Sequence, residues 1–138
     1  MTAILLVSHQ RVGLALREAL ESILQTPCGE PKPVVEVLED DRCHPDAFLH
    51  RLQNEIERLL LDGQLLILTD LPGATPHNLA VQAAAGRGVP VVSGINLPML
   101  LRCVNHIDLP AEVLAEKAVE GARAAIFQDA TKDGQNVA

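Results

Sequence analysis

Aromatic side chains are almost absent from this chain, which has no Trp, no Tyr and two Phe among 138 residues. Proteins that bind single-stranded nucleic acid stack bases on aromatic rings, so this scarcity argues against that class. Positive charge is also scarce, because 11 Lys and Arg stand against 18 Asp and Glu and give a formal net charge of −7. That sign is unfavourable for binding a phosphate backbone. The sequence therefore predicts no nucleic-acid partner.

Long apolar runs and a cysteine framework are missing as well. No apolar run approaches the ~18 residues that span a bilayer, and the N-terminal MTAILLVSHQ lacks the basic segment of a signal peptide. The cysteines Cys28, Cys43 and Cys103 form neither a CxxC motif nor an even set, which is typical of reduced thiols in the cytosol. Cys43 and His44 fit no zinc-binding spacing, so no metal site is expected. These absences predict a cytoplasmic protein without direct insertion into a membrane.

Aliphatic residues, rather than aromatic ones, provide most of the hydrophobic side chains of this chain. Hydrophobic residues make up 48% of the chain and its mean hydropathy is +0.18, which favours a folded domain over a disordered one. The length corresponds to one domain. We therefore expect a single domain with a core of Leu, Val, Ile and Ala.

Short apolar runs alternate with segments of helical periodicity along the chain. The runs predict strands over Ala3–Val7, Val34–Leu38, Leu65–Thr69 and Val89–Ser93. The periodicity predicts helices over Val12–Leu24, Pro45–Leu61, Thr75–Ala85, Pro98–Asn105 and from Pro110 towards Phe127. This alternation predicts an α/β fold with a doubly wound, mainly parallel sheet and helices on both faces. We expect the strand order 2-1-3-4, with a ligand site beyond the carboxyl ends of the strands.

Two chemically active side chains follow neighbouring strands of that order. His9 comes directly after the first strand and Asp70 ends the third. A carboxylate that accepts the proton of one ring nitrogen fixes the tautomer of a histidine and frees the other nitrogen to attack. Taken alone, His9 is also explained by hydrogen bonds to loop carbonyls, and Asp70 by capping of the following turn.

The turn after Asp70 leads into a helix that Thr75 and Pro76 are expected to open, with Thr75 as the N-cap. The backbone N–H groups of Gly73, Ala74 and Thr75 at such a helix start favour an anion, although, taken alone, these residues are more simply explained as a good helix start. The phosphate-binding patterns GxGxxG and GxxxxGK[ST] are absent. Together, these features predict a phosphoryl group carried on His9.

Further candidates for the pocket follow the first and fourth strands. Ser8 precedes His9, and Asn96 follows the fourth strand, where packing or helix capping explains it equally well. His77 lies near the expected anion site, and its position in the first turn of a helix is the simpler explanation.

Three motifs carry a resemblance to a known family. They are ILLVSHQRVGLAL around His9, ILTDLPGATPHNLA around Asp70, and VVSGINLPMLL after the third helix. In their order and spacing the chain resembles the IIA domain of the mannose-type (mannose–fructose–sorbose) sugar phosphotransferase system. The likeness covers residues 1–128 and leaves residues 129–138 as a polar tail that we expect to be flexible.

The resemblance implies roles for particular residues. The family's phosphorylated histidine falls on His9, its partner aspartate on Asp70, and the hydroxyl residue of its turn on Thr75. Members accept a phosphoryl group from the histidine-containing phosphocarrier HPr and pass it to a IIB domain. They are homodimers that exchange a C-terminal strand, which would correspond to about Ala124–Gln128 and form an antiparallel edge of the sheet. Such transfer depends on positioning and electrostatics, so no cofactor is expected.

Two departures from the family pattern leave other functions open. Many members have Gly-Thr-His-Gly where this chain has Val7-Ser8-His9-Gln10, and Pro72-Gly73-Ala74 replaces a bulky residue followed by Gly-Gly. One alternative is a regulatory protein whose phosphorylation state controls binding to a partner outside transport. Another is the phosphocarrier subunit of dihydroxyacetone kinase, for which a different turn after the third strand is expected.

Overall fold

A four-stranded sheet forms the centre of the molecule in a computed structural model that describes residues 1–25, 33–40 and 44–130. Neighbouring strands are parallel and follow the order β2-β1-β3-β4, as predicted. The strands are β1 (Thr2–His9), β2 (Val35–Asp40), β3 (Gln64–Thr69) and β4 (Val91–Val92).

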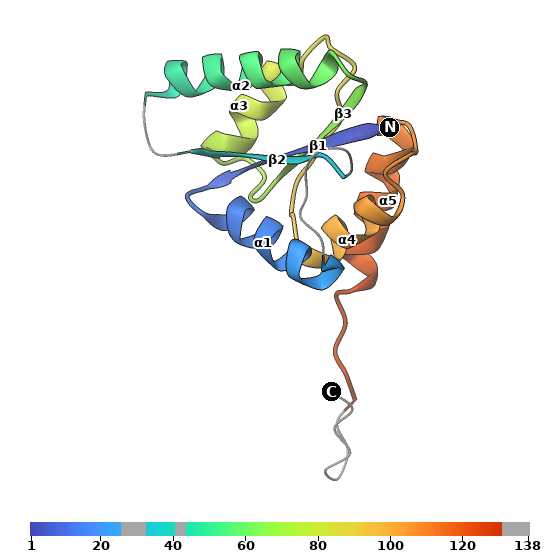
Figure 1. The fold of residues 1–138 in the computed structure, drawn as a ribbon. Coiled ribbons are helices and arrows are strands. Elements are labelled where there is room, and N and C mark those ends of the chain that lie inside the picture. Colours follow the sequence, from blue (N-terminus) through green and yellow to red (C-terminus); the bar gives the residue numbers. More distant parts are fainter. Residues whose placement is uncertain (26–32, 41–43, 131–138) are drawn as a thin grey trace.

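Helices cover both faces of this sheet (Figure 1). They are α1 (Val12–Leu24), α2 (Pro45–Leu60), α3 (Thr75–Ala84), α4 (Leu97–Asn105) and α5 (Ala111–Ala124). Figure 1 shows α2 and α3 together on one face and α1, α4 and α5 on the other. The result is the doubly wound α/β arrangement that the alternating sequence pattern predicts.

The central strands are apolar on both faces because each face packs against helices. Along β1, Ile4 and Leu6 belong to the core under α1, α4 and α5, whereas Leu5 and Val7 belong to the core under α2 and α3. Both cores are built from aliphatic side chains, and Phe48 is the one aromatic residue buried in the described part of the chain. This double burial explains why β1 and β3 read as continuous apolar runs.

All four strands differ from their predicted bounds. Strand β2 runs over Val35–Asp40 instead of Val34–Leu38, and β3 begins one residue earlier than predicted, at Gln64. The first strand does not stop at Val7, because Ser8 and His9 continue the ladder opposite Glu39 and Asp40 of β2. His9 is therefore the last residue of β1 rather than the first residue of a loop. The fourth strand is shorter than predicted: Pro90 has no N–H to donate to a ladder, and only Val91 and Val92 form β4.

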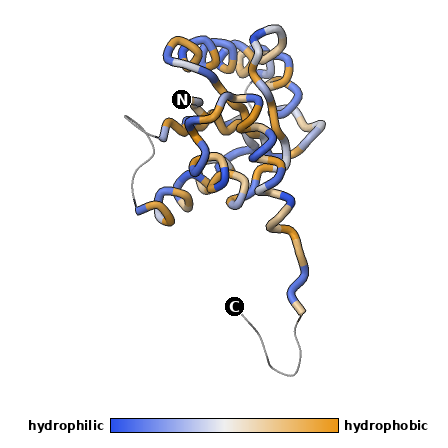
Figure 2. The backbone as a smooth tube through the Cα atoms, turned by 90° about the vertical axis from the view of Figure 1, so that its right-hand side faces the viewer, coloured by the Kyte–Doolittle hydropathy of each residue, from blue (hydrophilic) through white to orange (hydrophobic). Residues whose placement is uncertain are grey.

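The C-terminal helix also ends earlier than its periodicity predicts. Helix α5 stops at Ala124, and Ile126 and Phe127 follow it with 74% and 71% of their surface exposed. This segment runs away from the body of the molecule (Figure 1), and Figure 2 shows hydrophobic residues along it. In the described part of this single chain it forms no strand.

Three sequence-based expectations concern features outside the sheet. Among the described helices, none has the length and apolar character needed to cross a bilayer. Cys103 is a free thiol, and burial raises its pKa to about 12. Cys28, Cys43 and most of the predicted flexible tail lie outside the described residues.

Candidate functional site

The carboxyl ends of β1 and β3 bring His9 and Asp70 together. The two strands pair with Val7 opposite Thr69, so the residues that follow meet at the same edge of the sheet. The ring Nδ1 of His9 lies 2.9 Å from Oδ2 of Asp70, and the backbone N–H of His9 donates to the same oxygen at 2.9 Å. Asp70 therefore holds both the main chain and the ring of His9.

The carboxylate of Asp70 is a strong acceptor in this position. Burial alone would raise its pKa, but hydrogen bonds from the backbone and ring of His9 and from the backbone N–H of Leu71 outweigh that effect and lower the pKa below its ordinary value. An ionised carboxylate only accepts hydrogen bonds, so Nδ1 of His9 must carry the proton. The other ring nitrogen, Nε2, keeps its lone pair in the neutral ring. With 45% of the His9 side chain exposed, the imidazole is accessible from solvent.

Hydrogen bonds within the turn and from the start of α3 fix the conformation of the segment between Asp70 and α3. The N–H of Ala74 donates to the carbonyl of Leu71 at 3.3 Å, and Nδ2 of Asn78 donates to the carbonyl of Gly73 at 3.0 Å. Gly73 has a φ of 83°, and a Cβ added there would have no atom within 4 Å. Glycine is thus required by the backbone conformation and not by crowding.

Helix α3 begins one residue earlier than the predicted N-cap, Thr75, implies. Its N-cap is Ala74, which supplies no side-chain hydrogen bond, and Thr75 is the first helical residue. The exposed hydroxyl of Thr75 forms no hydrogen bond to another described residue. The first N–H groups of a helix also lack partners within the helix. This end of α3 therefore offers free donors and the positive end of the helix dipole.

Ser8 and Asn96, the other predicted pocket residues, support the backbone around the site. Ser8 is 1% exposed, and its Oγ accepts a hydrogen bond from the N–H of Gly13 at 2.8 Å, which fixes the start of α1. Asn96 is the N-cap of α4, because its Oδ1 accepts from the N–H of Met99 at 2.8 Å. Asn96 also borders a hollow together with Ser93.

Two features of the site escape the sequence analysis. Gln10, directly after His9, has a φ of 40°, a left-handed conformation that a residue other than Gly, Asn or Asp rarely adopts. The sequence feature that could have indicated this conformation is the glycine that many members of the mannose-type IIA family have at the position of Gln10. The hydroxyl of Thr69, the last residue of β3, lies 2.7 Å from Nδ1 of His77 on α3. The isolated hydroxyl at the end of an apolar strand is the only sequence signal for that contact.

Comparison with known proteins identifies the family of this chain and structures that share its fold. The family described as PTS system fructose IIA component (EIIA-man) matches residues 3–129. Among solved structures, the phosphotransferase system component EIIA from Streptococcus agalactiae is 22% identical with a TM-score of 0.74, over 93% of this chain and 97% of that one.

Two further structures have the same fold. The mannose/sorbose specific IIA subunit from Enterococcus faecalis is 21% identical with a TM-score of 0.72, over 96% of this chain and 97% of that one. The PTS IIA protein associated with the fucose utilization operon from Streptococcus pneumoniae is 25% identical with a TM-score of 0.72, over 92% of each chain. Because the family match spans nearly the whole sequence, the chain belongs to the EIIA-man family of mannose- and fructose-type IIA components of the sugar phosphotransferase system.

Proposed function

We propose that this protein is a phosphohistidine carrier that accepts a phosphoryl group from phospho-HPr on His9 and passes it to a IIB domain in sugar uptake. The observation that carries the proposal is the contact of 2.9 Å between Nδ1 of His9 and Oδ2 of Asp70 at the carboxyl edge of the sheet. It leaves one nucleophilic nitrogen on an accessible ring. Membership of a phosphotransferase family supports the same chemistry.

In the proposed reaction, Nε2 of His9 attacks the phosphorus of phospho-HPr in line. A new N–P bond forms at Nε2 while the old N–P bond breaks, and its electron pair stays on the histidine of HPr. The phosphorylated ring of His9 retains its Nδ1 proton and becomes positively charged. Asp70, which accepts that proton in a hydrogen bond, compensates the charge and orients the ring.

The turn after Asp70 binds the transferred group in this proposal. The N–H groups of Gly73 and Thr75, the free hydroxyl of Thr75 and the N-terminal end of α3 stabilise the equatorial oxygens. The N–H of Ala74, also predicted to bind phosphate, instead donates to the carbonyl of Leu71 within the turn. Onward transfer reverses the geometry, with a nucleophile of the IIB domain attacking the same phosphorus. Both partners then use the rim around His9.

Purified phospho-protein should transfer its label to a mannose-type IIB domain from the same organism within seconds. The reason is that the His9 side chain is 45% exposed and the phosphorylated ring is a good leaving group. Gel separation of the two labelled proteins measures the transfer, and an established IIA protein of the family verifies that the IIB domain is active. A label that stays on His9, together with phosphorylation-dependent binding to a protein outside transport, would instead favour the regulatory alternative.

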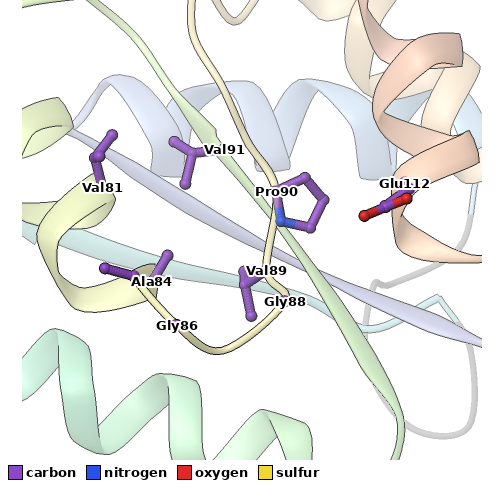
Figure 3. Close-up of a pocket in the computed structure, with 9 residues that line it drawn as sticks. Val81, Ala84, Gly86, Gly88, Val89, Pro90, Val91 and Glu112 are labelled. Carbon is purple, nitrogen blue, oxygen red and sulfur yellow. The ribbon is translucent and has the colours of Figure 1, made fainter.

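The outer edge of β4 supports a proposal about assembly. In the described residues β4 pairs only with β3. A hollow of about 490 Å³ lies beside this short strand, and Figure 3 shows side chains of α3 and of the segment before β4 around it, with Glu112 approaching from α5. Unpaired sheet edges are normally covered. We propose that residues 124–128 of a second copy cover this edge as an antiparallel strand and that their exposed Ile126 and Phe127 become buried there.

Light scattering should therefore report about twice the chain mass of 14.8 kDa. Deleting the chain from Ala124 onward should leave monomers or aggregates, because the pairing segment is lost. Replacing both Ile126 and Phe127 by serine should shift the equilibrium towards monomer, whereas Leu61→Ser, at a residue that is 83% exposed on another face, should not. A clean monomer of the full chain at micromolar concentration would contradict the proposal.

A further inference from the structure

The hydroxyl of Thr69 is buried at the end of β3. Thr69 is 0% exposed, and burying a hydroxyl without a hydrogen bond is unfavourable. Among the described residues its Oγ1 has one hydrogen-bond partner, Nδ1 of His77, at 2.7 Å. The imidazole of His77 thus satisfies a polar group that the aliphatic core around it cannot.

The direction of this hydrogen bond follows from the need of each buried polar hydrogen for an acceptor. If Nδ1 of His77 donated its proton to Thr69, the hydroxyl proton would have no acceptor in the described part of the chain. If Thr69 donates instead, both atoms are satisfied and the ring of His77 is neutral with its proton on Nε2. The second arrangement leaves no buried donor unpaired.

The hydrogen bond between Thr69 and His77 connects the end of β3 with the first turn of α3, on either side of the turn that follows Asp70. Thr69 is the residue before Asp70, and His77 lies in the first turn of α3, just after Thr75. The hydrogen bond therefore joins the two ends of the segment that carries Asp70, Gly73 and Thr75. It links the strand that presents the carboxylate to the helix that presents the anion-binding donors.

The same hydrogen bond lies on the face of the sheet to which His9 belongs. The Ser8 side chain bonds to Gly13 at the start of α1, so its neighbours Val7 and His9 point to the opposite face. Val7 packs in the core under α2 and α3, and Thr69 reaches His77 on α3 from that face. His77 is thus on the same side of the sheet edge as His9.

We propose that Thr69 and His77 are a pair of positioning residues for phosphoryl transfer, because their hydrogen bond sets the spacing between Asp70 and the first turn of α3. This inference rests on the proposed function of His9. Neither residue touches the reacting atoms in the proposed mechanism. Their effect is to hold the nucleophile's partner and the phosphate-binding turn in one geometry, and small displacements of such groups slow a transfer markedly.

Thr69→Val and His77→Phe should each slow phosphorylation of His9 by about tenfold. The double variant should be slowed by a similar factor and not by the product of the two, because both replacements break the same hydrogen bond. It also removes both polar groups together, so it leaves no unpaired hydroxyl in the core. Thr69→Ser keeps the hydroxyl and should restore the rate to within about twofold.

Matched controls make the same kinds of substitution away from the Thr69–His77 hydrogen bond, so they show whether the position of the change determines its effect on the rate. Thr2→Val removes another buried hydroxyl, the one that donates to the carbonyl of Leu109 at the opposite end of the sheet. His50→Phe makes the change of His77→Phe at an exposed position of α2. Both controls should keep the rate of the natural chain. Rates of Thr69→Val, His77→Phe and the double variant equal to those of these controls would overturn the proposal.

A second measurement keeps this proposal distinct from the proposed function. Long-range proton–nitrogen NMR spectra of the unphosphorylated protein should show His77 neutral, with its proton on Nε2 and Nδ1 accepting a hydrogen bond. Thr69→Val should shift the Nδ1 resonance of His77 and also those of the backbone amides of Asp70 and Thr75. If His9 takes no phosphoryl group from phospho-HPr, the proposed function fails. The rate at which the small donor phosphoramidate phosphorylates His9 then tests the role of Thr69 and His77. A proton on Nδ1 of His77, or unmoved amides, would refute the pair in either case.

Discussion

His9→Ala is expected to abolish phosphorylation of this protein by phosphoenolpyruvate, enzyme I and HPr. Nε2 of His9 is the nucleophile of the proposed reaction, and alanine supplies no atom that forms a bond to phosphorus. The natural chain should acquire a phosphate that is labile in acid and stable in base, as a phosphohistidine is. Incubation with labelled phosphoenolpyruvate and separation on gels measures both proteins side by side.

Other histidines of the chain provide the controls for this experiment. His50→Ala and His106→Ala change exposed residues on α2 and at the end of α4, away from Asp70, and should leave labelling intact. Thermal unfolding should show that His9→Ala still folds, because the His9 side chain is nearly half exposed and belongs to neither core. Persistent labelling of the His9→Ala protein would remove His9 from its proposed role.

The central strands were the most predictable part of the fold. Residues of β1 and β3 are buried on both faces, so their aliphatic runs signal strands without any knowledge of the neighbours. Helix α1 was predicted with the bounds that the structure shows, Val12–Leu24, because its apolar residues recur at helical spacing. These signals are local, and a single sequence contains them in full.

Element ends and hydrogen bonds were less predictable because they depend on distant partners. Ser8 and His9 extend β1 only because β2 lies alongside with Glu39 and Asp40 opposite them. The left-handed backbone of Gln10 and the contact of Thr69 with His77 likewise depend on how the strand ends meet the helices. The proposed strand at residues 124–128 depends on a second chain, so no pattern within one chain specifies its pairing.

Asp70 and its contact with the ring of His9 were expected from their places at the ends of neighbouring strands, but not all three hydrogen bonds of the carboxylate were. Two of them come from backbone N–H groups, of His9 and of Leu71, and such donors have no signature in the sequence. They matter because they keep the carboxylate ionised in a partly buried place. The chemistry of the site thus rests on one side chain that the sequence indicates and on main-chain geometry that only the fold provides.

Stability should therefore depend on pH through Asp70. Its pKa is lower in the folded protein than the usual carboxyl value, so the ionised group stabilises the fold at neutral pH and that contribution disappears as the pH falls through the folded pKa. Asp70→Asn carries no such charge. The difference in Tm between the natural chain and this variant should be largest at neutral pH and should shrink below about pH 4.

Asp70→Asn should slow the phosphorylation of His9 by about 10- to 100-fold while the protein remains folded. Asparagine keeps the shape of the side chain and an oxygen that accepts a hydrogen bond, but it cannot compensate the positive charge of the phosphorylated ring. Rapid-quench measurement of transfer from phospho-HPr gives the rate, and Asp62→Asn, at an exposed residue between α2 and β3, is the matched control. Because the fold is retained, a slower rate in Asp70→Asn alone measures the electrostatic part of the His9–Asp70 contact. Equal rates for the two variants would mean that the contact of 2.9 Å holds the loop in place without assisting transfer.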